Sequence, residues 1–239
     1  MNTSKEKTQM GRLIEKSNNI AVIPAVGAGI DGLSAAIGLI LSIRDTSFNN
    51  EINQYEEDES NKRMEKNVFL VYPKEISQDY KDYVNPNFII EDPSLRDLIV
   101  EINYSDSPAS KVNYSIDNET LKIVLTPVKR NFNTNNVKTK IMDRNFDLII
   151  TIGAARKEDL GLSYFDMEDE YKKAVILNID NNNDNTHYGL LNIVNPKIES
   201  LSLLMINLIL RNGLTLNANT GKALLTGLID LDKDKERTN

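Results

Sequence analysis

Two short segments of this chain hold the residues whose types and spacing could support chemistry. The first reads Gly27-Ala28-Gly29-Ile30-Asp31-Gly32 and fits the pattern G-x-G-x-x-G between an expected strand and an expected helix. Glycines at these positions let the backbone approach a phosphate at the start of a helix. The segment therefore allows a dinucleotide site, although a charged Asp31 would face the pyrophosphate. The alternative is a tight turn that only joins strand to helix.

The second segment is rich in Asp and Asn and follows another expected strand. It reads Asn178-Ile179-Asp180-Asn181-Asn182-Asn183-Asp184-Asn185. Ligands of open α/β sheets collect at the carboxyl ends of the strands. Several polar side chains at such a place could bind a metal ion or a phosphate. The alternative is an Asn-rich turn in an Asn-rich protein.

Composition excludes several other kinds of site. The chain has no Cys, so disulfides, thiolate metal sites and Cys nucleophiles are all excluded. Its one His, His187, rules out a His-rich zinc site, and no G-x-S-x-G elbow supports a Ser-His-Asp triad. Gly221-Lys222 lacks the flanking residues of a phosphate-binding Walker loop. The net charge of −7 argues against broad nucleic-acid binding, whereas Lys129-Arg130 could still hold a small anion.

The elements that would position these segments alternate along the chain. Strands are expected where apolar residues run without interruption, because a strand buried on both faces has no polar alternation. Helices are expected where apolar residues recur at helical spacing or all round. The order predicts an α/β fold with a mostly parallel sheet flanked by helices. The expected strands are Ile20–Val26, Val68–Tyr72, Phe88–Ile90, Phe146–Ile152 and Ala174–Ile179; the expected helices are 3–17, Leu33–Ile43, Leu201–Leu210 (N-cap Ser200 or Glu199) and Ala218–Leu228.

Two insertions are expected within a single domain that spans residues 1–239. Residues 45–66 are dense in Asn, Glu, Asp and Lys, which is typical of a solvated loop. Residues 98–126 alternate between apolar and polar side chains around a turn at Asp117-Asn118, which predicts an antiparallel β meander. Residues 131–140 are polar and Asn-rich and are expected to form a loop. The exposed edges of the meander would suit a protein partner or homodimerisation.

The most apolar stretch, Ile20–Ile43, is long enough to cross a membrane. It contains Asp31, Pro24 and several glycines, so a buried strand, turn and helix explains it better. The residues before it do not form a signal peptide. We therefore expect a cytoplasmic protein without membrane contact.

The segments together resemble the N-terminal domain of the DHH phosphoesterases, in particular the nanoRNase and 3′-phosphoadenosine-5′-phosphate phosphatase branch. The first motif of that family is a strand, His-x-x-Pro-Asp-x-Asp-x-x-Gly-Ser and an apolar helix. In the same frame the family's His falls on Ala25, its first Asp falls on Gly29, and its second Asp is retained as Asp31. The second motif is a single Asp that ends a buried strand, and Gly153 stands in its place.

The third motif of the family is Asn-Ile-Asp-His-His-Pro followed by Asn and Phe-Gly. This chain retains Asp180, whereas both His positions are Asn, at Asn181 and Asn182. A further Asp of the family would fall on Leu231. The resemblance covers residues 10–45, 67–91 and 145–232. The C-terminal substrate-binding domain of the family would follow and is not part of the sequence.

The resemblance implies a site that normally holds two manganese ions between Asp and His ligands. Asp31 and Asp180 are the residual metal ligands, and Gly27, Gly29, Asn181 and Asn182 are candidates for binding a ligand. We assign no catalytic residue and expect no resident cofactor. The one exception is a single divalent ion such as Mg²⁺ or Mn²⁺, because neutral Asn oxygens can serve as ligands of hard ions.

Three hypotheses follow. The first is a degenerate, catalytically inactive phosphoesterase-like domain that acts as a binding or scaffold module, with a nucleotide, a short oligonucleotide or a protein as partner. The second is a phosphoesterase with a remodelled one-metal site that acts on short oligonucleotides or nucleotide phosphates. The third is an unrelated nucleotide-binding α/β protein that uses Gly27–Gly32.

Overall fold

The computed structural model describes residues 8–52, 66–76, 80, 85–103, 105, 107–142 and 144–238. The chain divides into two compact units. We call the first unit, Met1–Ser94 together with Arg144–Asn239, the body, and the second unit, Leu95–Asp143, the insert.

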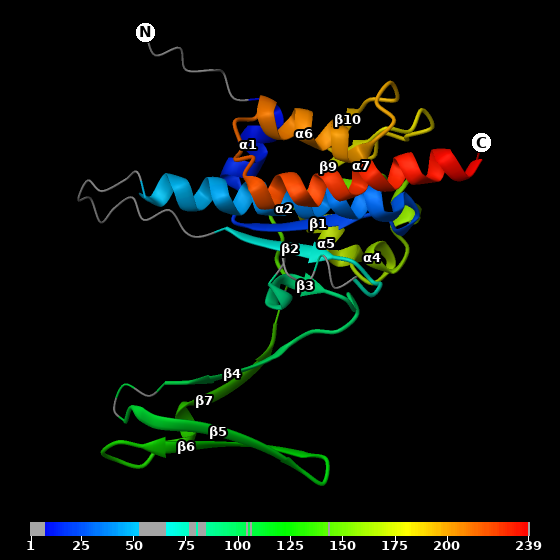
Figure 1. Ribbon diagram of the computed structural model, residues 1–239. Coiled ribbons are helices and arrows are strands. Elements are labelled where there is room, and N and C mark those ends of the chain that lie inside the picture. Colours follow the sequence, from blue (N-terminus) through cyan, green and yellow to red (C-terminus); the bar gives the residue numbers. More distant parts are fainter. Residues whose placement is uncertain are drawn as a thin grey trace. The chain divides into compact units, whose positions relative to one another are not determined.

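A six-stranded parallel sheet forms the centre of the body (Figure 1), with the strand order β10-β9-β8-β1-β2-β3. Each pairing in this sheet is parallel, and the central strand β1 lies between β2 and β8. The strands are β1 (Asn19–Pro24), β2 (Asn67–Val71), β3 (Ile89–Ile90), β8 (Leu148–Ile152), β9 (Val175–Asp180) and β10 (Leu191–Val194). The predicted fold class is confirmed.

Two layers of helices bury the two faces of this sheet, which is why its central strands are apolar throughout. Alternate residues of β1 enter opposite layers: Ile20 and Val22 join one apolar cluster, and Ala21 and Ile23 join the other. The first layer contains α1 (Gln9–Lys16), α2 (Gly29–Ile52), α6 (Leu201–Arg211) and α7 (Ala218–Thr238). The second contains the 3-10 turn η5 (Lys157–Leu160) and the short helices α4 (Leu162–Phe165) and α5 (Glu168–Lys173).

Helix α2 is longer than the predicted Leu33–Ile43. It continues through the start of the polar stretch expected at 45–66, so residues 45–52 are helical, whereas residues 53–65 lie outside the described part. The segment Val26–Thr46 is long and apolar enough to cross a membrane, but most of it is buried inside the body. Gly38 permits close packing, because a Cβ there would lie 2.5 Å from Leu224 of α7.

The insert consists of two separate two-stranded antiparallel ladders. Strands β5 (Ala109–Asp117) and β6 (Thr120–Pro127) form a hairpin, and β4 (Leu98–Ile102) pairs with β7 (Val137–Ile141). The antiparallel character of the insert is confirmed, but its strands do not follow one another as a meander. The loop predicted for 131–140 holds for residues 131–136, apart from the 3-10 turn at Thr134–Asn136. It is wrong for residues 137–140, because the alternating sequence Val-Lys-Thr-Lys-Ile of β7 forms a strand.

Candidate functional site

The residues singled out from the sequence meet at the carboxyl edge of the parallel sheet. After β1, the 3-10 turn η1 (Val26–Ala28) leads directly into α2, which begins at Gly29. Strand β8 ends next to Gly153, and β9 ends at Asp180. Since β8 pairs with both β1 and β9, the three strand ends lie side by side.

Asp31 caps the N-terminus of helix α6. Its Oδ2 accepts a hydrogen bond from the backbone N–H of Leu201 at 2.6 Å, and its Oδ1 accepts from the N–H of Ser202 at 2.9 Å. The Ser200 hydroxyl donates to Oδ1 at 3.0 Å and accepts from the N–H of Leu203 at 3.1 Å, so the predicted N-cap Ser200 is confirmed. The first amides of a helix attract anions. Here an internal carboxylate, only 8% exposed, already occupies that place.

The space beside Asp31 is filled by apolar atoms. Gly153 has a φ of +68°, and a Cβ there would lie 2.7 Å from both Ala28 Cβ and Leu201 Cδ1. A Cβ at Gly32 would lie 2.5 Å from Ala28 Cβ. Leu201 therefore packs where a side chain at position 153 would have to pass, and the backbone conformation at that position favours glycine.

Asp180 is 1% exposed and makes its hydrogen bonds within its own loop. Its Oδ1 accepts from the N–H of Asn181 at 2.8 Å, and its Oδ2 accepts from Asn185 Nδ2 at 2.7 Å. The two residual carboxylates thus have different partners: Asp31 holds α6, and Asp180 holds the loop after β9. Across the described residues, no three Asp, Glu or His side chains gather closely enough to hold a metal ion.

A buried network of neutral polar groups extends from Asp180 along β8, β9 and β10. Asn178 donates to Asn185 Oδ1 at 2.9 Å and to Asn192 Oδ1 at 3.4 Å, and it accepts from the Thr151 hydroxyl at 3.3 Å. The Tyr188 hydroxyl lies 2.7 Å from Thr151 Oγ1 and donates to it, because the proton of Thr151 points to Asn178. Burial raises the pKa of Tyr188 well above its ordinary range. Burial thus keeps the Tyr188 hydroxyl protonated at neutral pH, and the Thr151 hydroxyl and the Asn amides of the network are uncharged.

Of the four predicted ligand-binding residues, Asn181 is used inside the fold. Its amide donates to the backbone carbonyls of Ile198 at 3.0 Å and Glu199 at 2.9 Å, which ties the β9 loop to the segment before α6. Asn182 is exposed and accepts from the N–H of Asp184 at 2.9 Å. Gly27 and Gly29 are exposed, and a Cβ on either would meet no atom within 4 Å.

Sequence reasoning missed most of the buried network. Thr151 and Asn192 were not singled out, and Asn178 and Tyr188 entered only as positions matched to the third motif of the DHH phosphoesterases or as part of an Asn-rich segment. One signal could have found two of them: Thr151 and Asn178 are polar residues inside otherwise apolar strands, and both are 0% exposed. A buried polar side chain requires hydrogen-bond partners nearby.

Comparison with known proteins gives a fold and no family. No family model and no curated protein matches the chain. Among solved structures, an exopolyphosphatase-related protein from Bacteroides fragilis matches with a TM-score of 0.53 at 12% sequence identity. The match covers 95% of this chain and 51% of the other, so the chain spans about half the length of that structure. At this identity the similarity shows a shared fold and nothing about activity.

Proposed function

We propose that this chain is a degenerate DHH-type phosphoesterase domain that has lost catalysis and acts as a binding or scaffold module. The observation that carries the proposal is the use of Asp31. Its carboxylate accepts three hydrogen bonds from the start of α6, so it serves as a structural cap. A carboxylate with this role is not available to a metal ion without uncapping the helix.

The filled space at Gly153 supports the same proposal. Two-metal phosphoryl transfer needs several anionic or imidazole ligands around one cavity. At the corresponding edge of this sheet, Leu201 and Ala28 pack against Gly153, and Asn181 binds backbone carbonyls. Because bound metals supply most of the charge stabilisation in such reactions, their loss removes several orders of magnitude in rate.

The test combines metal binding with hydrolysis. Wild type, Asp31→Ala, Asp180→Ala and the control Asp184→Ala, an exposed residue of the same loop, are titrated with Mn²⁺ and Mg²⁺ in a thermal-shift assay. Hydrolysis of a chromogenic phosphodiester and a short oligoribonucleotide is followed in parallel, with an active phosphoesterase as positive control. We expect no metal-dependent rise in melting temperature and no hydrolysis. We also expect Asp31→Ala and Asp180→Ala to melt lower than wild type even without metal.

A different pattern of metal-dependent stabilisation would contradict the proposal. Metal-dependent stabilisation that Asp31→Ala and Asp180→Ala both abolish, but Asp184→Ala does not, would overturn the proposal. Together with metal-dependent cleavage, it would establish the remodelled one-metal phosphoesterase instead.

A nucleotide phosphate is the small ligand that we propose for the exposed backbone at Gly27 and Gly29. The backbone at Gly27 and Gly29 is exposed and unobstructed, and the Asp31 carboxylate is turned towards α6. The charge of Asp31 therefore does not oppose a phosphate over these glycines as directly as the sequence suggested. Saturable binding of AMP or NAD that is lost in Gly29→Val would support this ligand, and absence of binding at millimolar concentration would exclude it.

A further inference from the structure

The β5–β6 hairpin of the insert has one apolar and one polar face. Residues that pair across antiparallel strands point to the same side. The pairs Val112–Leu125, Tyr114–Ile123 and Ile116–Leu121 form one face, which carries no charge. The other face is polar except for one valine: Lys111, Asn113, Ser115, Asp117, Thr120, Lys122, Val124 and Thr126.

The apolar face is exposed. Val112, Tyr114, Ile116, Leu121 and Ile123 are 66%, 77%, 75%, 60% and 51% exposed. Among the described residues the hairpin is a sheet of two strands, and no further described strand pairs with either of its edges. A two-stranded sheet is marginally stable in water without a further layer or strand. An uncharged face of this size is typical of an interaction surface.

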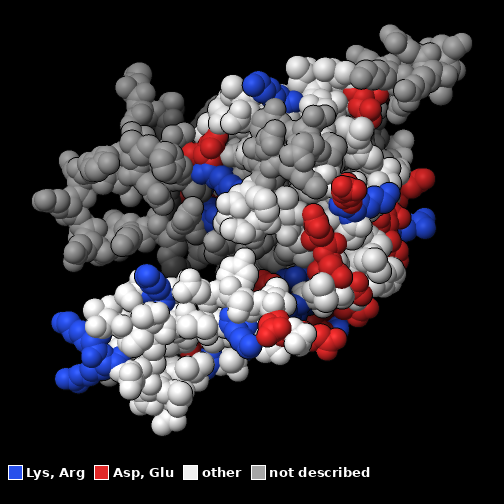
Figure 2. All heavy atoms as spheres, turned by 60° about the horizontal axis from the view of Figure 1, so that its bottom comes forward, with Lys and Arg blue, Asp and Glu red and all other residues white. Residues whose placement is uncertain are grey.

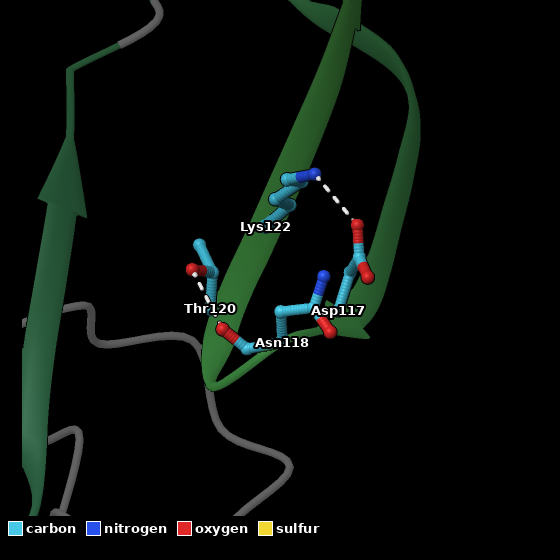
Figure 3. A network of polar contacts seen from close by, with 4 residues as sticks. All are labelled: Asp117, Asn118, Thr120 and Lys122. Atoms are coloured by element: carbon cyan, nitrogen blue, oxygen red, sulfur yellow. Dashed lines mark hydrogen bonds and ion pairs between the residues drawn. The ribbon is translucent and has the colours of Figure 1, made fainter.

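The turn of the hairpin fixes which residues lie on this face. Asn118 and Glu119 both have positive φ, 43° and 64°, which is the geometry of a two-residue turn matched to the twist of a hairpin. Lys122 Nζ lies 3.4 Å from Asp117 Oδ2 beside this turn, and Figure 3 shows the two side chains pointing towards one another. Because the turn length sets the register, the six apolar residues stay on one side.

The two ends of the hairpin carry opposite charges. Glu119 and Asp117, the latter ion-paired with Lys122, give the turn a net negative charge, whereas Lys111, Lys129 and Arg130 lie at the open end. Figure 2 shows Lys and Arg side chains gathered at the left end of a largely uncharged surface at the bottom of the view. At a rise of about 3.4 Å per residue, the two ends are roughly 20 Å apart. This separation exceeds the Debye length of about 8 Å at physiological salt, so the ends do not neutralise each other within one copy.

We propose that this apolar face is a homodimer interface, on which two copies of the chain pack their hairpins face to face and antiparallel about a two-fold axis. This arrangement places the acidic turn of each copy against the basic open end of the other, so the charges are complementary at both ends. The uncharged faces meet without burying an ion, in a two-layer β-sandwich.

The size of the face is sufficient for such a dimer. Five side chains that are more than half exposed each offer on the order of 100 Å² of apolar surface. With Leu125 one face offers about 600 Å², and two faces bury about 1,200 Å², at the lower end of specific stable interfaces. Tyr114, the most exposed of the six, is of a residue type enriched at the centre of such interfaces. The proposal concerns the insert alone, so it does not depend on whether the carboxyl edge of the body is catalytic.

The first test is the mass of the full chain in solution, by analytical ultracentrifugation at micromolar concentration. We expect a dimer for wild type and a monomer for Tyr114→Asp, whose dimer dissociation constant should be at least 100-fold higher than that of wild type. The control Asn113→Asp adds the same charge on the polar face of the same strand and should leave the dimer intact. A monomeric wild type, or a dimer that Tyr114→Asp does not weaken, would overturn the proposal.

A second test keeps the apolar face unchanged and therefore does not depend on the folding of Tyr114→Asp. One variant carries Lys129→Glu and Arg130→Glu, and the other carries Asp117→Lys and Glu119→Lys. In an antiparallel dimer each variant alone brings like charges together, whereas their mixture brings opposite charges together. At low salt we expect two weakened homodimers and a restored heterodimer. Equal association in all three samples would refute the antiparallel arrangement, and monomers throughout would refute the interface.

Discussion

The parallel sheet of the body and the hairpin of the insert are both built of β-strands, but the central strands of the sheet are buried and the hairpin is exposed to solvent. Every residue of β8 is buried, whereas every residue of β5 is exposed. The continuous apolar sequence of β8 is covered by helices on both faces, and the alternating sequence of β5 leaves one apolar face uncovered. The body therefore derives its stability from its own layers. The insert, as proposed above, finds its second layer in another molecule.

Among the substitutions proposed for the body, Gly153→Ala should lower the free energy of unfolding the most. The new Cβ would lie 2.7 Å from Ala28 and from Leu201, in a left-handed backbone conformation. We expect a loss of about 4 kcal/mol in the free energy of unfolding, from overpacking and backbone strain together. Gly213→Ala is the matched control, because it has φ +67° and no atom within 4 Å, and it should lose about 1 kcal/mol. Urea denaturation measures both, and equal losses would show that the carboxyl edge is not tightly filled.

Asp31→Ala should have the next largest effect. It removes the cap of α6 and leaves two buried N–H groups without their acceptor, which should cost about 3 kcal/mol. Asp184→Ala in the exposed loop should cost under about 0.5 kcal/mol. Chemical denaturation without metal is the measurement. A loss for Asp31→Ala as small as that control would mean that the carboxylate is not structural.

One buried tyrosine and one partly buried tyrosine give a smaller, pH-dependent effect on the free energy of unfolding. The Tyr188 hydroxyl bonds Thr151, so Tyr188→Phe should lose about 1 kcal/mol at neutral pH. The Tyr171 hydroxyl is buried without a hydrogen-bond partner in the described part of the chain, so Tyr171→Phe should be neutral or slightly stabilising.

Burial raises the pKa of both Tyr171 and Tyr188. Above about pH 10 the unfolded chain ionises its tyrosines while the folded chain keeps these two neutral, so stability must fall as pH rises. Each Phe variant should make this alkaline loss less steep. An unchanged slope in both, measured by denaturation from pH 9 to pH 11, would contradict their burial.

The smallest effect is expected in the hairpin. The Lys122–Asp117 ion pair joins side chains that are 55% and 62% exposed, so Lys122→Gln should change hairpin stability by only ~0.3 kcal/mol. Amide hydrogen exchange of β5 and β6 measures this change, with Lys140→Gln in the β4–β7 ladder as a second exposed pair for comparison. A loss above about 1 kcal/mol would show that the hairpin is held by its own charges rather than by a covered face.

The sequence was sufficient to predict the sheet of the body, because strands buried on both faces leave continuous apolar runs such as Leu148–Ile152. It was not sufficient for β10, whose four residues are only half-buried, or for α5, whose charged sequence shows no apolar stripe. Strand β7 was hidden in an Asn-rich stretch, although its alternation was visible.

For the candidate site, the sequence identified which residues stand at the carboxyl edge but not what they bind. Asp31 was expected to be a residual metal ligand, yet its hydrogen-bond donors come from residues about 170 positions further along the chain. Such a contact leaves no trace in local spacing. Composition likewise could not separate the buried Asn178 and Asn185 from the exposed Asn182, because the difference arises only when β8, β9 and β10 lie side by side.

The central position of β1 also has a consequence for synthesis of the chain. Ile20 pairs with Val68 on one side and with Leu148 on the other, and the whole insert is made between these two partners. Protein synthesis adds roughly 5–20 residues per second, so several seconds pass between the emergence of β2 and that of β8. During this time the β8-facing edge of β1 has no partner strand. A nascent chain arrested between residues 72 and 147 should therefore bind holdase chaperones, and one arrested after α6 should release them.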